Sequence, residues 1–248
     1  MTVSIITVVY NRKTTIERAI RSVLQQTYPS IEYLIVDGGS RDGTLEVIEA
    51  YRNKITKVIS EKDKGMYDAL NKGIQLATGD VIGVLHSDDI FYANDSIEKI
   101  AKEFILDYSL QCVYGDVAFI NPNKGNKMTR YFSSANFSVD KFDRGFMPAH
   151  PSFFCRKICF EQFGTYKLNY DIAADFDLLV RFLKIHRIKS KYVPLCTTYM
   201  HTGGKSTTGI KSTLKINKEF LHILKTHGIK SNYIKLYSRY IQKVFEFI

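Results

Sequence analysis

The chain has 248 residues, of which 45% are hydrophobic and 13% aromatic, a composition that excludes a disordered or fibrous protein. It carries 35 basic and 25 acidic side chains, but a basic balance alone is weak evidence for nucleic acid binding, and we predict no nucleic acid partner. The length allows one large α/β domain with an appendage, and the four cysteines, which lack a CxxC spacing, argue against a cysteine-bound zinc site.

The N-terminal segment MTVSIITVVYN is apolar but carries no basic region in front of it. It is also too short to span a bilayer, so we interpret it as the first strand of a sheet and not as a targeting segment. We therefore expect a cytoplasmic protein, in which the cysteines are reduced thiols.

The first half of the chain alternates between strand and helix patterns. The β-branched run at residues 3–9 precedes TTIERAIRSVLQQ, whose apolar residues recur at helical spacing and whose Thr14 and Glu17 match a capping box. We predict further strands at residues 33–36, 57–60 and 81–85, and helices that begin at Thr44 and after Gly65. This alternation predicts an α/β fold with a mostly parallel central sheet flanked by helices.

Polar side chains follow each of the four predicted strands at its carboxyl end. They are Tyr10 and Asn11 after the first strand, Asp37 after the second, Glu61 and Asp63 after the third, and Asp88 and Asp89 after the fourth. Open parallel sheets bind their ligands at this edge. The sequence therefore predicts a ligand site there.

The fourth strand ends on two consecutive carboxylates, in the segment VIGVLHSDDIF. Side by side at roughly 5 Å, in an effective dielectric near 20, Asp88 and Asp89 would repel each other by about 3 kcal/mol. One explanation is a polar turn or a helix cap, although the next helix has its own cap candidates at residues 94–96. The other is a divalent cation, Mg²⁺ or Mn²⁺, held by carboxylate oxygens together with a substrate diphosphate.

The second half of the chain is less regular. We predict strands at residues 112–119 and 191–199, a helix at residues 175–185, and loops in NPNKGNK, MPAHPSFFCRK and HTGGKSTTG.

The tail of the chain is strongly basic, with nine basic and two acidic residues from Lys205 onward, a balance of +7. Apolar and basic residues recur there at helical spacing, which indicates helices that either pack against the domain or lie on an anionic membrane surface. We divide the chain into a domain at 1–207, with a donor-side half at 1–110 and an acceptor-side half at 111–207, and a helical C-terminal extension at 208–248.

Four ordered segments resemble a known family: VSIITVVYNR, IEYLIVDGGSRDGT, EKDKGMYDALNKGIQLATGD and VIGVLHSDD. Together they are similar to the donor-binding half of the family 2 glycosyltransferases, which have the A-type nucleotide-diphospho-sugar transferase (GT-A) fold. The resemblance is strong over residues 3–90 and looser over residues 147–205, through HPSFF, ADFDLLVRF and HTGGKS. It is closest to members that build bacterial surface polysaccharides.

The resemblance implies a binding site for the nucleotide of a nucleotide-diphosphate sugar, expected to be a UDP-sugar. Val9, Tyr10 and Asn11 would form the base pocket, and Asp37 would accept the uracil N–H, although Asp37 could instead anchor the GGS turn. Contacts to base, sugar or diphosphate would also come from Asp63, Lys64 and Asn71.

The resemblance also assigns the paired carboxylates. The family motif is usually Asp-x-Asp, and here Ser87 precedes the pair. Asp89 then corresponds to the ligand of Mn²⁺ or Mg²⁺, and Asp88 to a ribose contact or to a group that supports the metal ligand. His86 stands where many relatives have Asn or a carboxylate, and we expect it to pack or hydrogen bond and not to bind the metal.

A base for the acceptor hydroxyl is implied by ADFDLLVRF. Asp175 corresponds to the expected base, with Ala174 in front of it where many relatives have Glu, and the alternative is that it only caps the helix. Asp177 lies two positions on and faces elsewhere, so it cannot replace Asp175. His201 and Lys205 are candidates for the diphosphate or metal, and His150 for the acceptor side; an exposed loop position is the alternative for His201.

These assignments imply an inverting hexosyl- or N-acetylhexosaminyltransferase that acts on a glycan or lipid-linked acceptor in surface polysaccharide synthesis. Asp175 would remove the acceptor proton in a single displacement. A noncatalytic nucleotide-sugar-binding protein is an alternative, because such a protein could dispense with Asp175. A sugar nucleotidyltransferase is another, but VVYNRKTT lacks the glycine-rich, basic triphosphate loop expected after its first strand. The lipid-linked acceptor would place the chain at the inner face of the plasma membrane, bound through its C-terminal helices.

Overall fold

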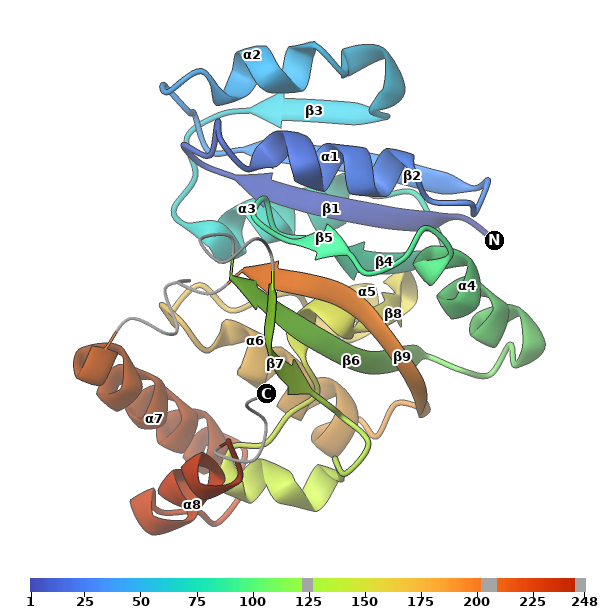
Figure 1. The fold of residues 1–248 in the computed structure, drawn as a ribbon. Coiled ribbons are helices and arrows are strands. Elements are labelled where there is room, and N and C mark those ends of the chain that lie inside the picture. Colours follow the sequence, from blue (N-terminus) through green and yellow to red (C-terminus); the bar gives the residue numbers. More distant parts are fainter. Residues whose placement is uncertain (122–126, 202–208, 244–248) are drawn as a thin grey trace.

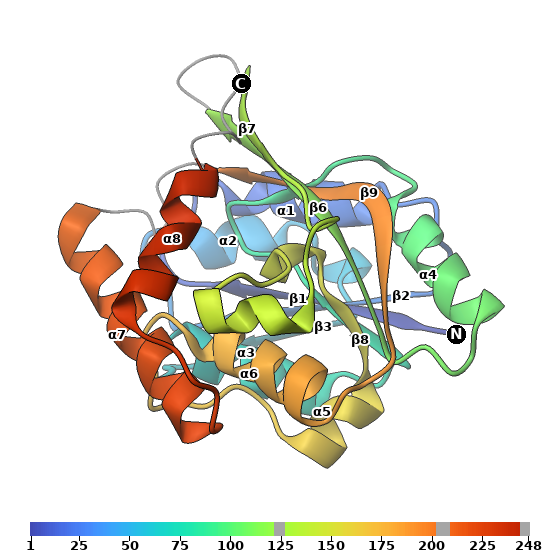
Figure 2. The same ribbon diagram turned by 90° about the horizontal axis from the view of Figure 1, so that it is seen from below.

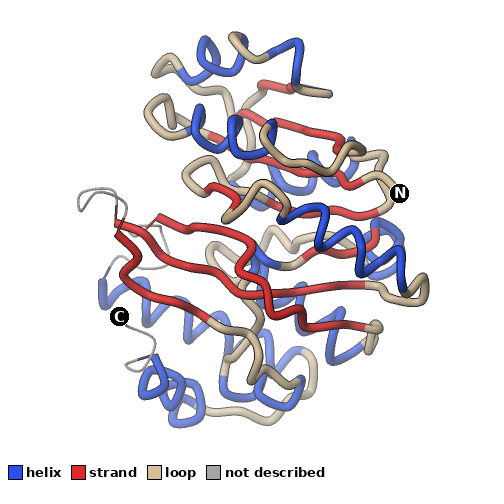
Figure 3. Tube along the Cα trace, turned by 45° about the vertical axis from the view of Figure 1, so that its right-hand side comes forward, coloured by secondary structure: helices blue, strands red, loops and turns tan. Residues whose placement is uncertain are grey.

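The computed structural model describes residues 1–121, 127–201 and 209–243. They build a nine-stranded sheet in the order β3-β2-β1-β4-β8-β6-β9-β5, with β7 paired to β6, and helices cover both faces of this sheet (Figures 1 and 3). The fold class predicted from the sequence, a central sheet flanked by helices, is confirmed.

The first half forms the parallel part of the sheet. Its strands are β1 (Val3–Val9), β2 (Ile31–Asp37), β3 (Lys57–Ser60) and β4 (Val81–Val84), and each neighbouring pair is parallel. The segments between them contain α1 (Ile16–Leu24), α2 (Thr44–Glu49), the 3₁₀ turn η1 (Arg52–Lys54) and α3 (Met66–Leu76).

The predicted capping box of α1 does not form. The helix begins after Thr15, which makes no side-chain cap, and Glu17 instead accepts hydrogen bonds from Arg21 and from the Tyr51 hydroxyl at 2.7 Å. These bonds are stronger than the predicted cap because the Glu17 carboxylate binds the cationic Arg21 and also Tyr51, which follows α2. Thr44, predicted as a cap, is the first residue of α2.

The second half extends the sheet with antiparallel and parallel pairs. Its strands are β5 (Ile90–Phe91), β6 (Cys112–Asn121), β7 (Lys127–Phe132), β8 (Phe154–Arg156) and β9 (Ser190–His201). The short β8 lies antiparallel between β4 and β6, whereas β9 runs parallel to β6 and pairs with β5. The helical elements are α4 (Ser96–Leu106), η3 (Val139–Arg144), η4 (His150–Ser152), α5 (Lys157–Phe163), α6 (Ala174–Leu179) and its π-helical continuation η5 (Val180–Ile185).

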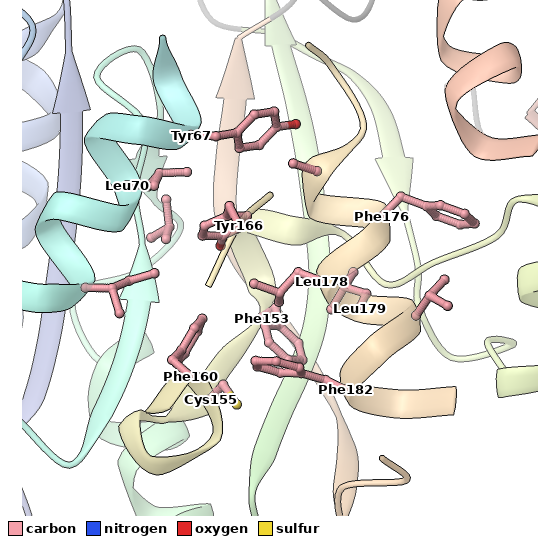
Figure 4. Close-up of a cluster of buried hydrophobic side chains, with 14 of the residues drawn as sticks. Tyr67, Leu70, Phe153, Cys155, Phe160, Tyr166, Phe176, Leu178, Leu179 and Phe182 are labelled. Atoms are coloured by element: carbon pink, nitrogen blue, oxygen red, sulfur yellow. The ribbon is translucent and has the colours of Figure 1, made fainter. Parts of the chain in front are cut away.

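The sheet lies between helices on its two faces (Figure 2), and each face carries an apolar layer of buried side chains. On one face, residues of α1 and α4 pack against alternate positions of β1 and β2. On the other, α3, α5 and α6 share a core rich in aromatic rings, in which Phe176 and Phe182 of the α6 segment are fully buried (Figure 4). This second layer joins α3, from the donor-side half, to α6, from the acceptor-side half.

The C-terminal extension consists of α7 (Gly209–Thr226) and α8 (Tyr233–Lys243), which lie against α6 and η3 (Figure 1). The ring of Phe220 stacks on that of Phe176 with 3.8 Å between centroids. Glu219 accepts hydrogen bonds at 3.0 to 3.2 Å from the backbone N–H groups of Asp171, Ile172 and Ala173, directly before α6. Packing of the tail against the domain is therefore observed, and contact of its exposed residues with a membrane stays a prediction.

Within the described ranges, no helix combines the length and the apolar character that crossing a membrane requires.

Candidate active site

The carboxyl ends of β1, β2 and β3 lie side by side. Val9 is in register with Asp37, and Asp37 with Ser60. The next residues continue this pairing, because the N–H of Gly38 donates to the Val9 carbonyl at 2.9 Å and the N–H of Glu61 to the Asp37 carbonyl at 3.0 Å. The sheet thus gathers the polar segments that follow these strands at one edge, as the sequence predicts.

Asp37 anchors the turn that follows β2. Its side chain is 0% exposed, and Oδ2 accepts hydrogen bonds from the N–H groups of Gly39 and Ser40 at 3.0 Å and from the Ser60 hydroxyl at 2.7 Å. The Ser40 hydroxyl donates to Oδ1. Asp37 thus anchors the turn, which is one of its two expected roles, and its contact with a base stays a prediction.

Tyr10 and Asn11 complete this corner in different ways. Tyr10 is 60% exposed and presents its ring beside the site, whereas Asn11 adopts a left-handed backbone with φ of 51°. Asn11 tolerates this conformation, and its Oδ1 accepts the N–H of Arg41 at 2.9 Å while its own N–H donates to Ser40 Oγ at 2.8 Å. Asn11 thus fixes the turn, and Tyr10 offers a flat surface to a ligand.

The loop from β3 to α3 is held by ion pairs and backbone contacts. Lys72 pairs with Glu61 at 2.8 Å and donates to the Lys62 carbonyl at 3.2 Å. Asp63 is half-buried, and its Oδ1 accepts the N–H of Gly65 at 2.8 Å. The side chain of Lys64 is exposed at the surface of this loop.

Asn71, a predicted donor contact, faces the protein instead. Its amide bonds to both backbone groups of Tyr166, with Nδ2 donating to the carbonyl at 2.8 Å and Oδ1 accepting the N–H at 2.9 Å. These two bonds tie α3 to the segment before α6 and fix the orientation of the amide. One N–H of its NH₂ group and one lone pair of Oδ1 remain, so the donor contact stays a prediction.

The paired carboxylates follow β4 and meet the end of β9. Asp89 is 3% exposed, and burial, reinforced by the charge of Asp88, raises its pKa well above the usual range. Because Ile90 pairs with Tyr199, the last residue of β9 reaches this place, and the N–H of His201 donates to Asp89 Oδ1 at 3.3 Å. The ionised form of Asp89 is therefore unfavourable unless a positive charge lies beside it.

Asp89 and His201 fit a divalent cation. Both ring nitrogens of His201 are buried and have no hydrogen-bond partner among residues 1–121, 127–201 and 209–243. Burial, with a further effect of the Arg18 charge, lowers the pKa of His201, so its ring is neutral and keeps a lone pair for a metal. Throughout the described parts, no three ligating side chains converge, so a bound cation would take its remaining ligands from a substrate diphosphate and water.

Asp175 is the second residue of α6 and is half-buried. Burial raises its pKa to about 6, against the opposing effects of the Phe176 N–H, which donates to Oδ1 at 2.8 Å, and of the Tyr67 hydroxyl at 3.3 Å. A carboxylate with this pKa is ionised at neutral pH and remains a useful proton acceptor.

His86 links Asp175 to the paired carboxylates. It lies within electrostatic range of both Asp88 and Asp175, and burial, with the neighbouring His150, nevertheless lowers its pKa to about 4. His86 is therefore a neutral ring near both acidic groups, and it packs against the ring of His150 with 6.1 Å between centroids, in agreement with a packing role.

His150 is buried next to the ring of His86 and does not lie on an open surface. It is buried, its Nε2 is 2.6 Å from the Tyr166 hydroxyl, and burial lowers its pKa to about 4. Tyr166 in turn stacks on Tyr67, with 5.6 Å between ring centroids (Figure 4). His150 thus supports the ring pair below Asp175.

Asp177 is excluded as a second base by its surroundings. It is 0% exposed and pairs with Arg181 at 2.8 Å, His227 at 2.9 Å and Lys167 at 3.4 Å. It joins α6 to the end of α7, as expected for a side chain that faces away from Asp175.

Two residues that act on this site escape the sequence patterns, and one predicted residue lies outside the described residues. The ring of Tyr166 stacks on that of Tyr67, and the carboxylate of Glu219 accepts the Ile172 N–H shortly before Asp175. No sequence motif marks either residue. Lys205, predicted near the diphosphate, falls in the range 202–208, outside the described residues.

The chain is similar to known proteins in sequence. Residues 4–163 match the family model described as Glycosyl transferase family 2. The chain is 30% identical over 225 residues to the PGL/p-HBAD biosynthesis glycosyltransferase of Mycobacterium bovis (strain BCG / Pasteur 1173P2), covering 88% of this chain and 82% of that protein. It is 30% identical over 189 residues to the chondroitin synthase of Pasteurella multocida (strain Pm70), covering 75% of this chain and 19% of that protein.

Solved structures show the same fold at lower identity. S. aureus TarS 1-349 in complex with UDP-GlcNAc has a TM-score of 0.66 and 18% identity, covering 90% of this chain and 66% of that chain. The mannosyltransferase PcManGT from Pyrobaculum calidifontis, in complex with GDP-Man and Mn²⁺, has a TM-score of 0.69 and 16% identity, covering 93% of this chain and 65% of that chain. This chain thus spans about two thirds of each.

Proposed function

Since the chain belongs to glycosyl transferase family 2 and has the GT-A fold, we propose that it is an inverting transferase of hexosyl or N-acetylhexosaminyl units. The donor is a nucleotide-diphosphate sugar, a UDP-sugar in our proposal, and the acceptor is a hydroxyl of a glycan or a lipid-linked saccharide in cell-surface polysaccharide synthesis.

One observation carries the proposal: Asp175, with a pKa of about 6, and Asp88, beside Asp89, both interact electrostatically with the ring of His86, so the three groups belong to one site. The base and the diphosphate-side carboxylates come from segments almost 90 residues apart, and Asp175 lies beyond the residues that match the family model. A noncatalytic binder of nucleotide sugars has no need of a raised-pKa carboxylate at this place.

The reaction uses groups that the chain itself positions. Asp175 accepts the proton of the acceptor hydroxyl as that oxygen attacks the anomeric carbon from the side opposite the diphosphate. The bond to the diphosphate oxygen breaks in the same step, so the anomeric configuration inverts. The Phe176 N–H holds the carboxylate of Asp175 in place for this transfer, and the Tyr67 hydroxyl, which also donates to the Ile172 carbonyl, lies 3.3 Å from the same oxygen.

Asp89 and His201 would hold the divalent cation, Mn²⁺ or Mg²⁺, and the cation would supply positive charge for the departing diphosphate. The neutral ring of His201 and the buried carboxyl of Asp89 support this assignment. The Mn²⁺ named for PcManGT supports it by analogy of fold.

The acceptor is proposed from the chain's surface and its relatives. Tyr233 and Ile234, at the start of α8, are exposed to 48% and 84%, and exposed Lys225, Lys230 and Lys235 surround them in the chain. Apolar tips among basic residues suit an anionic membrane surface, which would hold the protein at the inner face of the membrane near a lipid-linked acceptor.

A panel of nucleotide sugars, assayed for Mn²⁺-dependent release of the nucleoside diphosphate in the presence of short glycan acceptors, tests the proposal. We expect release with at least one UDP-sugar, a product of inverted configuration by NMR, and a loss of about 10² to 10⁴ in rate for Asp175→Asn. Equal rates for both proteins would refute a transferase with this base. Release of pyrophosphate from UTP and a sugar phosphate would instead indicate a nucleotidyltransferase.

A further inference from the structure

We propose that Glu219, in the C-terminal helix α7, is a positioning residue for the transfer step, because its carboxylate fixes the backbone that carries the base Asp175. The inference rests on the proposed function, in that Asp175 accepts the proton of the acceptor hydroxyl. Both residues lie beyond the part of the chain that matches the family model. Glu219 acts on turnover through the place of Asp175 and makes no contact with the substrate in this proposal.

The carboxylate of Glu219 binds three consecutive backbone N–H groups. Its Oε1 accepts the N–H of Asp171 at 3.2 Å, and its Oε2 accepts those of Ile172 and Ala173 at 3.1 and 3.0 Å. Ala173 is the residue directly before the first turn of α6. These bonds therefore form a clasp that fixes the path by which the chain enters α6.

The contacts of α7 lie on both sides of Asp175 in the chain. Glu219 binds the segment that ends at Ala173, and the next residue of α7, Phe220, stacks its ring on that of Phe176, with 3.8 Å between centroids and 9° between the planes. Only two residues separate these two anchors, and Asp175 is one of them. The backbone of the base can move only if a charge-assisted hydrogen bond or a buried ring stack gives way.

The clasp also holds a peptide group that binds Tyr67. The carbonyl of Ile172 accepts the Tyr67 hydroxyl at 2.5 Å, and the N–H of the same peptide group, that of Ala173, donates to Glu219. Tyr67 belongs to α3, and its hydroxyl lies 3.3 Å from Oδ1 of Asp175 (Figure 4). One peptide group thus joins Glu219 to a helix of the donor-side half, next to the base.

Proton transfer is sensitive to the place of the base, because a displacement of about 1 Å costs roughly 10²-fold in rate. The proposed nucleotide site lies at the carboxyl ends of β1 to β4, whereas the bonds of the clasp all go to residues 171–173. Loss of the clasp should therefore lower kcat and leave the affinity for the nucleoside diphosphate unchanged.

Glu219→Ala and Glu219→Gln in the full chain test the inference, with the UDP-sugar that the nucleotide-sugar panel identifies as donor. We expect Glu219→Ala to lower kcat roughly 10-fold to 100-fold. The dissociation constant of UDP, measured by calorimetry at saturating Mn²⁺, should stay within about twofold of the wild type. Glutamine keeps one oxygen that can take the place of Oε2 and accept two of the three N–H groups, so Glu219→Gln should recover most of the lost kcat and fall roughly threefold below the wild type.

Glu32 offers a matched control. Its carboxylate also accepts backbone N–H groups, those of Thr78 at 2.8 Å and Gly79 at 3.2 Å, but it lies at the amino end of β2, the opposite end of that strand from the site. We expect Glu32→Ala and Glu32→Gln to lower the melting temperature as the Glu219 variants do and to keep the wild-type kcat. If either alanine variant does not fold, the two glutamine variants decide in the same way.

The outcomes separate the inference from the proposed function. A Glu219→Ala protein with the wild-type kcat, a loss of kcat that Glu32→Ala shows to the same extent, or UDP binding weakened as much as kcat overturns the inference and leaves the transferase intact. A wild type that turns over no nucleotide sugar overturns the proposed function, and this inference with it.

Discussion

The replacement Asp175→Asn should make the protein more stable while it removes activity. Burial raises the pKa of Asp175 from the ordinary 3.8 to about 6. Because each pKa unit corresponds to about 1.4 kcal/mol, the ionised carboxylate costs the folded protein up to about 3 kcal/mol. Part of the side chain reaches solvent, which reduces this to about 2 kcal/mol.

The sign of this effect depends on pH. Below pH 3.8 the carboxyl is protonated in both states and costs nothing, and as pH rises through about 6 the folded state must carry the buried charge. Asparagine never carries that charge. We therefore expect Asp175→Asn to melt roughly 4 to 8 °C above the wild type at pH 8, and at the same temperature below pH 4.

Differential scanning calorimetry across this pH range, with turnover measured in parallel, checks the reasoning. The wild-type kcat/KM should fall tenfold per pH unit below about pH 6, and the residual activity of Asp175→Asn should lack this step. Asp177→Asn is the control, because its carboxyl is paired with Arg181 and its loss should destabilise the protein. The account is refuted if Asp175→Asn melts below the wild type at pH 8, or if the difference in melting temperature between the two proteins is the same at every pH.

Three further changes have defined outcomes. Chelation of divalent cations should abolish turnover, and His201→Ala should raise the Mn²⁺ concentration for half-maximal activity by roughly tenfold to a hundredfold; an unchanged Mn²⁺ titration would remove His201 from the metal site. Glu219→Ala should cost about 2 kcal/mol and lower the melting temperature by roughly 4 to 8 °C, whereas exposed Lys218→Ala should change neither, as thermal unfolding can show. Tyr67→Phe should shift the acid limb of the pH profile upward, since the pKa of Asp175 loses a lowering hydrogen bond; a shift downward would contradict the donor role given to the hydroxyl.

The edge of the sheet where the site lies follows from local sequence rules. The strands at residues 3–9, 57–60 and 81–84 appear where β-branched runs end in turn residues, and parallel strands must bring their carboxyl ends to one edge. For that reason the neighbourhood of Asp37, Asp63 and Asp89 is predictable without coordinates.

The partners of individual side chains are not predictable in the same way. Whether Asn71 faces a ligand or Tyr166 depends on a contact between residues 95 positions apart, and hydrophobic periodicity carries no information about it. The same is true of His150, whose Nε2 hydrogen bonds to the hydroxyl of Tyr166, 16 positions away. Position 38 shows the limit most clearly, since a Cβ atom there would lie 2.4 Å from Oδ2 of Asp63, which another loop places in that space.

The antiparallel part of the sheet also lies beyond local patterns. Strand β8 has three residues and sits between β4 and β6, so its presence depends on tertiary packing more than on its own length or alternation. The π-helical turns of η5 within the predicted helix are likewise set by the surrounding core.

The clasp between Glu219 and the backbone before α6 has a consequence for how such enzymes can be cut and recombined. A fragment trimmed to the boundary of the family match would contain the carboxyl ends of β1 to β4, yet it would lack Asp175, His201 and the Glu219 carboxylate that binds the backbone before α6. Chimeras that exchange the last 40 residues should therefore differ in turnover rate and keep the same affinity for the nucleotide. The C-terminal helices would then affect the chemical step and not the binding of the donor.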